Sequence, residues 1–316
     1  MFESFLEVAQ QVLILFLLIG VGFVCGKIKF LTEATVKGFT DFVLIIVIPC
    51  VIVHSFQREF DPAMLLSLGI AVLSAIGVHL LGILIGLVAL RDKNKAREKV
   101  MQFSLVFSNA AFMSVPLQQA LLGDDGVFYG AAYVAVFNLL LWSYGLVLMS
   151  RQPKKEGEER QKVLSWKKLV FNPGVIGLVV GITLFLCSCT LPEILAAPIG
   201  HLAALNTPLP MVIVGYHLSN AKILSALKDP KVYLTMLLRL VVVPLLTLGI
   251  FLLCGIHDVM MVAVVIAASA PVGASVTMFA SKYRQDVELS VNLVSISTLL
   301  SILTMPVIVT LAQMAL

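Results

Sequence analysis

The sequence predicts an all-α membrane protein with ten transmembrane helices, arranged as a 5+5 inverted repeat in which helices four and nine are broken. Three observations predict it: an apolar composition, basic residues that alternate between apolar runs, and prolines within two matching runs. Of the 316 residues 59% are hydrophobic and 13% are charged, and the mean hydropathy is +1.02. Soluble domains contain about 25% charged residues, so the excess apolar surface must face lipid. The formal charge of +4 is spread over short loops, so no nucleic-acid partner is expected.

Ten apolar runs are separated by short loops. A helix needs about 20 residues to cross a bilayer, and runs of that length cover 8–26, 34–56, 63–90, 99–122, 126–150, 168–190, 195–219, 231–255, 258–280 and 287–313. From the N-terminal tail to the C-terminal tail, Lys and Arg number 0, 3, 1, 5, 0, 7, 0, 3, 0, 2 and 0. Basic loops face the cytoplasm. We therefore expect a multi-pass protein of the cell membrane with both termini outside.

A polar central loop divides the runs into two sets of five. Residues 1–150 form the first repeat, 151–165 a cytoplasmic linker and 166–316 the second repeat. Because five is odd, the second set enters the membrane from the opposite side, as in an inverted repeat. Pro49 and Pro210 lie 161 residues apart, as do Gly20 and Gly181, and these matches support the repeat.

Enzyme, cofactor and metal signatures are missing from the sequence. It contains no G-x-S-x-G, P-loop or H-E-x-x-H motif. Cys187 and Cys189 form a C-x-C pair without a further ligand at metal-binding spacing. The N-terminal tail carries Glu3 and Glu7 and no basic residue, so the first run is expected to be a retained span and not a secretory signal.

Runs four and nine differ from the others because each has proline and polar or small residues near its middle. Run four contains SNAAFMSVP, with Asn109 and Pro116, and run nine contains ASAPVGAS, with Pro271 and Gly273. Proline lacks an amide hydrogen and clashes with the preceding turn, so each helix should break or kink there. Each proline could merely kink a packed helix. Two broken helices in matching positions, however, indicate a transport site.

The charges within the runs indicate the sign of the substrate. The 18 Asp and Glu residues lie in loops or at run ends, with Asp41 nearest to an exception. Arg239 lies inside run eight, where a cation that faces lipid is costly. The second halves of the broken helices would also direct their N-terminal amides at the midplane. We therefore expect an anion-binding site. Arg239 either contributes to this site or extends along the helix so that its charge reaches the inner membrane surface.

Other polar residues within the runs have two interpretations. His79 in run three is expected to pack against neighbouring helices, with a pH-sensitive lining group as the alternative. Asn138 in run five should face protein or a cavity, as should the Ser297, Ser301 and Thr304 stripe in run ten. Three G-x-x-x-G pairs should permit close helix contacts: Gly22/Gly26, Gly82/Gly86 and Gly177/Gly181.

The sequence resembles the auxin efflux carrier family of prokaryotic transporters, which is related to the plant PIN-type auxin carriers. The resemblance covers the whole chain and is most specific in SNAAFMSVPLQQALLG, YVAVFNLLLW and SAPVGASVTMFASKY. It implies that helices four and nine cross at their breaks, beside an often dimeric scaffold of helices one, two, six and seven. Asn109 would contact the substrate carboxylate. PIN-type carriers have Pro-Asn where this chain has Ser108-Asn109, and many have a long cytoplasmic loop that is absent here, which argues against auxin itself.

The sequence thus predicts a secondary carrier that moves a small carboxylate anion across the cytoplasmic membrane by alternating access, in an elevator-like motion. The resemblance points to a dicarboxylate such as malate or malonate, and to a homodimer in the lipid bilayer. A membrane receptor or scaffold that senses a ligand without moving it, and a channel, are the alternatives. No cofactor is expected, and coupling to sodium or protons stays open. The residues expected at the site are Ser108, Asn109, Pro116, Asn138, Arg239, Pro271, Gly273 and Ser275.

Overall fold

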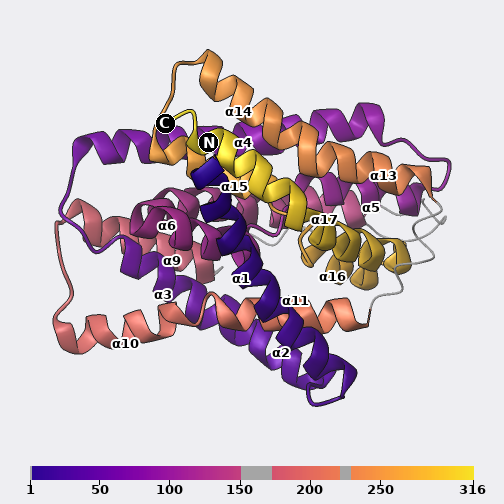
Figure 1. Ribbon diagram of the computed structural model, residues 1–316, viewed down its shortest axis with the longest axis horizontal. Coiled ribbons are helices and arrows are strands. Elements are labelled where there is room, and N and C mark those ends of the chain that lie inside the picture. Colours follow the sequence, from indigo (N-terminus) through magenta and orange to yellow (C-terminus); the bar gives the residue numbers. More distant parts are fainter. Residues whose placement is uncertain (1, 151–172, 221–228) are drawn as a thin grey trace, which may run out of the picture.

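The computed structural model describes residues 2–150, 173–220 and 229–316 and is helical throughout these ranges apart from short connections and one isolated backbone bridge (Figure 1). Within them, seven helical stretches are long and apolar enough to cross a membrane, and two further apolar helices are shorter. The all-α, multi-pass membrane fold is confirmed. The count of ten spans and the inverted repeat stay predictions, and the linker 151–165 lies outside the described residues.

The helices follow the expected runs closely. The first half contains α1 (Phe2–Lys27), α2 (Glu33–Phe42), α3 (Ile48–Ser55), α4 (Pro62–Ala89), α5 (Lys95–Val106), α6 (Val115–Leu140) and α7 (Leu146–Ser150). The second half contains α9 (Pro173–Leu186), α10 (Glu193–Ala204), α11 (Pro208–Ser219), α13 (Pro230–Leu237), α14 (Val243–Leu253), α15 (Val259–Ser269), α16 (Ser275–Lys282) and α17 (Val287–Gln313). The described residues also contain four π-helical segments: η1 (Val43–Val47), η2 (Ala110–Ser114), η3 (Leu141–Gly145) and η4 (Leu238–Val242). η1, η3 and η4 each join two helices directly, whereas η2 follows a non-helical stretch and leads into α6.

Three of these π-helical segments precede a proline at the same spacing. Pro49, Pro116 and Pro244 each follow, by two residues, the end of a π-helical segment. A proline ring clashes with the carbonyl one turn earlier in an α-helix, and the wider π turn offers that carbonyl more room. Pro116 therefore continues into α6 and does not break run four, contrary to the sequence prediction. The break lies earlier in the run, at Phe107 to Asn109.

A glycine reverses the chain inside α6. Gly123 has φ of 62° and ψ of −148°, a conformation that disfavours residues with a side chain. A Cβ on Gly130 would lie 2.1 Å from Oε1 of Gln118, so the segments before and after Gly123 pack side by side. This reversal separates runs four and five near the boundary expected from the sequence.

Glycines bring several helices into backbone contact. A Cβ on Gly22 of α1 would lie 2.2 Å from the carbonyl oxygen of Val212 on α11, and one on Gly215 would lie 2.0 Å from that of Ile19. A Cβ on Gly177 of α9 would meet Cα of Pro49 at 2.9 Å. Such approach needs glycine, so the predicted role is confirmed for Gly22/Gly26 and Gly177/Gly181. A Cβ on Gly82 or Gly86 would meet its nearest neighbour at 3.4 or 3.6 Å, which is an ordinary contact, so this third pair does not have the predicted role.

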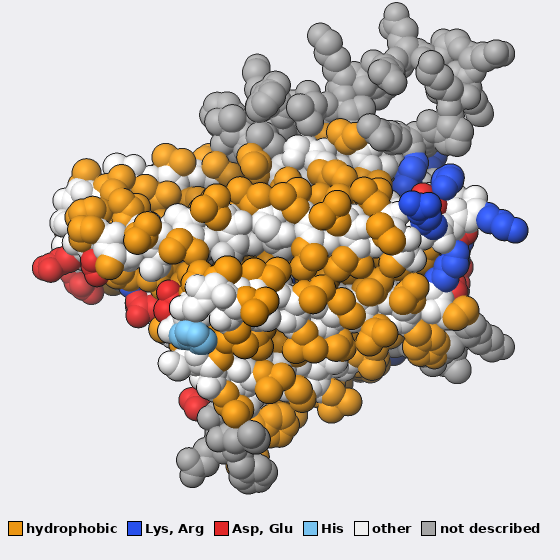
Figure 2. Space-filling view, turned by 90° about the horizontal axis from the view of Figure 1, so that it is seen from above, with side chains coloured by type: hydrophobic (Ala, Val, Ile, Leu, Met, Phe, Trp, Pro, Cys, Tyr) orange, Lys and Arg blue, Asp and Glu red, His pale blue; other side chains and the backbone are white. Residues whose placement is uncertain are grey.

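Charged side chains gather at opposite ends of the molecule: Asp and Glu dominate one end, and Lys and Arg, together with some Asp and Glu, the other (Figure 2). At the basic end, Arg97 at the start of α5 pairs with Asp229, which caps α13, and lies 3.6 Å from Asp286, which caps α17. Lys231 and Asp92 pair at 2.8 Å. This basic-end cluster holds together the first turns of three helices.

The basic-end cluster predicts a pH dependence of stability. The side-chain hydrogen bond from Lys231 and the backbone bond from Asn94 lower the pKa of Asp92. A carboxyl whose pKa is depressed on folding stabilises the protein above its unfolded pKa of about 3.9 and loses that effect as pH falls through the folded pKa. Asp92→Asn should therefore unfold at a lower temperature than the wild type near pH 6, with the difference shrinking toward about pH 3.

Thermal unfolding in detergent across this pH range measures the effect. Glu59→Gln, which changes an exposed carboxylate in the loop between α3 and α4, is the matched control and should show no such pH-dependent difference. A deficit for Asp92→Asn that stays constant with pH would contradict the assignment.

Candidate functional site

Two helices are interrupted where the sequence placed its broken runs. α5 ends at Val106, and Phe107 is extended before the helix resumes at Ala110. α15 ends at Ser269, Ala270 is extended, and α16 begins at Ser275. Pro271 and Gly273 thus lie within the second break, as their residue types predict.

The two breaks cross as a short antiparallel pair. Ser108 and Val272 form a backbone bridge. The backbone N–H of Asn109 donates to the carbonyl of Pro271 at 2.7 Å, and that of Gly273 donates to the carbonyl of Phe107 at 3.0 Å. Backbone N–H and C=O groups that lose their helical partners within a membrane need other partners. Here the backbone groups of one break form hydrogen bonds with those of the other.

Gly273 is required by this close approach. A Cβ there would lie 2.8 Å from the carbonyl oxygen of Ser108, which is a backbone atom held in the pair. On the other side of the pair, the N–H of Val272 donates to Oγ of Ser297 on α17 at 3.0 Å. Part of the polar stripe predicted in run ten therefore supports the crossing.

Arg239 lies beside the crossing and is fully enclosed, with 1% of its surface exposed. Its guanidinium donates to the carbonyl of Leu105 at 3.0 Å, to that of Ala268 at 2.8 Å, and twice to that of Ala270, at 3.1 and 3.2 Å. These carbonyls belong to the C-terminal ends of α5 and α15. The interpretation in which Arg239 extends to the membrane surface is therefore wrong.

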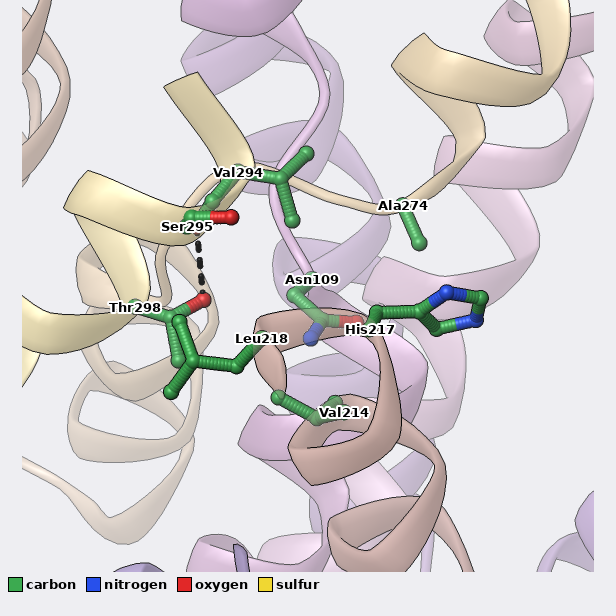
Figure 3. A pocket seen from close by; sticks show the side chains of 8 residues that line it. All are labelled: Asn109, Val214, His217, Leu218, Ala274, Val294, Ser295 and Thr298. Atoms are coloured by element: carbon green, nitrogen blue, oxygen red, sulfur yellow. Dashed lines mark hydrogen bonds between the residues drawn. The ribbon is translucent and has the colours of Figure 1, made fainter. Parts of the chain in front are cut away.

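A small cavity of about 20 Å³ opens against the crossing (Figure 3). The breaks contribute Asn109 and Ala274, and the rest of the lining comes from α11 and α17. In the view of Figure 3, Asn109 lies between Val294 and Val214. The lining residues are Asn109, Val214, His217, Leu218, Ala274, Val294, Ser295 and Thr298.

The polar groups of the lining retain hydrogen-bonding capacity. Within the described part of the chain, the side-chain amide of Asn109 forms no hydrogen bond, and the residue is 7% exposed. Ser295 and Thr298 each donate to a carbonyl of their own helix at 2.8 Å, which leaves oxygen lone pairs free. An amide with two free N–H groups can bind a carboxylate oxygen at this position.

The other predicted site residues do not line the cavity. Oγ of Ser275, at the first residue of α16, is buried and has no hydrogen-bond partner among the described residues. Oγ of Ser108 is also buried. The side chain of Asn138 donates to the carbonyl of Val134 at 2.9 Å. Pro116 is buried in the first turn of α6.

His79 follows the packing interpretation. It is 0% exposed, its Nδ1 lies 2.7 Å from the carbonyl oxygen of Ala75, and its ring centroid lies 5.0 Å from that of Tyr133. Sequence reasoning missed His217, Ser295 and Thr298 as lining residues. The polar pattern of run ten suggested an inward face, but it selected Ser297 and Ser301, which lie on a neighbouring part of the same helix.

Comparisons with known proteins identify the family. Residues 7–309 match the family model described as membrane transport protein. An uncharacterized transporter of Methanothermobacter thermautotrophicus is 24% identical over 308 residues, which cover 96% of this chain and 97% of the relative. The matched proteins are transporters and not enzymes. The chain therefore belongs to the membrane transport protein family, whose members resemble auxin efflux carriers.

Proposed function

We propose that the protein is a secondary carrier that moves a small carboxylate anion across the cytoplasmic membrane by alternating access. The observation that carries the proposal is the unpaired amide of Asn109, held at the crossing and directed into a cavity. One N–H of this amide donates to a carboxylate oxygen. The oxygens of Ser295 and Thr298, whose protons go to carbonyls of their own helix, accept from a donor on the rest of the substrate.

The electrostatics of the crossing favour an anion. The helices that resume at Ala110 and Ser275 both begin there, and a helix N-terminus carries a partial positive charge. Among the described residues, no Asp or Glu lines the cavity. A cation would meet two positive helix ends without a carboxylate to offset them, whereas a carboxylate meets N–H donors.

The cavity is too small for the proposed substrate, which supports a mechanism in which helices move to admit it. A volume of about 20 Å³ holds about one water molecule and excludes a dicarboxylate. Substrate entry requires the crossing to separate from α11, which carries Val214, His217 and Leu218. We propose that the protein is a ten-helix inverted repeat and a homodimer, and that α1–α3 and α9–α11 form its scaffold. The remaining helices, which come from both repeats, move in an elevator-like manner.

Uptake into proteoliposomes tests this function. Purified protein in sealed vesicles should accumulate labelled malate, malonate or a related organic acid at a rate that saturates with concentration, and protein-free vesicles should not. A thermal-shift screen of mono- and dicarboxylates identifies the ligand beforehand, since binding raises the unfolding temperature. Binding without flux would favour the receptor interpretation, and ion currents far above carrier turnover would favour a channel. Either result would contradict the proposal.

A further inference from the structure

Four helix ends meet at the crossing, and they carry charge of two signs. The C-terminal ends of α5 and α15 present carbonyl groups, and the helices that begin at Ala110 and Ser275 present N–H groups. Each C-terminal end is equivalent to about −0.5 elementary charge and each N-terminal end to about +0.5. The two carbonyl ends therefore sum to about one negative charge at membrane depth.

Arg239 supplies one positive charge to these carbonyl ends. Its four hydrogen bonds reach Leu105 on α5 and both Ala268 and Ala270 at the end of α15. The planar guanidinium suits this task because its donors spread in one plane and reach several acceptors at once. The negative pair of helix ends is thereby matched by a side chain of the protein itself, and the positive pair is left for the substrate.

In carriers with discontinuous helices, unwound carbonyls and helix C-terminal ends are the groups that coordinate sodium. Here the carbonyls of Leu105, Ala268 and Ala270 accept from Arg239 instead. We propose that the guanidinium of Arg239 takes the place of a coupling sodium ion at the crossing, so that the carrier binds its anion without sodium. The consequence for transport rests on the proposed function, whereas the structural role of the guanidinium does not.

In this role Arg239 is a positioning residue. It holds the C-terminal ends of α5 and α15 in the positions that allow Ser108 and Val272 to pair. Arg239 is not one of the residues that line the cavity. Lysine cannot substitute for it, because one ammonium group cannot follow the fork geometry that reaches both helix ends.

Thermal unfolding in detergent tests the assignment, with sodium chloride compared against choline chloride at equal ionic strength. The wild type should unfold at the same temperature in both salts. Arg239→Ala should unfold lower by on the order of 5 °C, because buried carbonyls lose their donors. Guanidinium chloride at about 20 mM, far below denaturing concentrations, should restore part of that loss. Leu240→Ala, on the same π turn and 1% exposed in the wild type, should lose stability without being restored.

If Arg239→Ala does not fold, Arg239→Lys takes its place and should unfold below the wild type without recovery in sodium. Stabilisation of the wild type by sodium, or equal restoration of Leu240→Ala and the Arg239 variant by guanidinium, would overturn the inference. Uptake in sodium-free vesicles separates the two proposals. Flux that is tenfold faster with sodium refutes the role of Arg239 and leaves the carrier intact, and a lack of flux in both media refutes the carrier alone.

Discussion

Replacement of Gly273 with valine is expected to abolish transport and to lower the unfolding temperature substantially. A Cβ at this position would lie 2.8 Å from the carbonyl oxygen of Ser108, a backbone atom that cannot move without breaking the paired crossing. Overpacking of this kind costs about 1–3 kcal/mol, and separation of the breaks also removes the bonds from Asn109 to Pro271 and from Gly273 to Phe107. Gly273→Ala should show the same change with a smaller amplitude.

Uptake into proteoliposomes and thermal unfolding together measure this effect. Gly249→Val on α14 is the matched control, because a Cβ there meets nothing within 4 Å, and it should behave like the wild type. Wild-type uptake and stability for Gly273→Val would mean that the breaks do not need to touch.

Replacement of Asn109 with alanine is expected to reduce transport strongly while leaving the fold almost unchanged. A hydrogen bond to a charged group contributes about 1.5–3 kcal/mol, so the half-saturating concentration should rise by about one to two orders of magnitude. The amide bonds to no other group in the described chain, which predicts little change in unfolding temperature. Asn109→Asp should be worse, because its carboxylate repels the anion.

The split between transport and stability is the decisive part of this second prediction. Gln119→Ala, which removes an exposed amide on α6, should change neither uptake nor unfolding. Equal losses of uptake and stability in Asn109→Ala would indicate a structural residue, and unchanged uptake would remove Asn109 from the binding site.

The fold class could be predicted because the composition of a segment and the charge of the loops beside it can be read without knowing the tertiary structure. Apolar runs report lipid exposure directly, and the glycine spacing that predicted close contacts at Gly22 and Gly177 depends only on the size of one residue. Pro271 likewise marked a real interruption. Each of these features can be recognised without knowing which distant segment packs against it.

The details of the site could not be predicted because they depend on partners far away in sequence. Pro116 looked like a break, yet a π turn accommodates it, and the chain instead opens at Ser108, where Val272 offers a backbone partner. The ligands of Arg239 are carbonyl groups, which every residue possesses and which therefore leave no pattern. In α17, Ser295, Ser297 and Thr298 are all at most 4% exposed, so burial does not reveal which of them faces the cavity.

The interlocked glycines of α1 and α11 have a mechanical consequence. With Gly22 against Val212 and Gly215 against Ile19, a slip of one residue along this seam would drive a side chain into the opposing backbone. α1 and α11 therefore move as one rigid unit. Any sliding of the crossing relative to α11 must occur on the opposite face of α11, where Val214 and Leu218 meet the crossing. A compound bound along that second face would block the sliding and would also occupy the cavity that Asn109 lines.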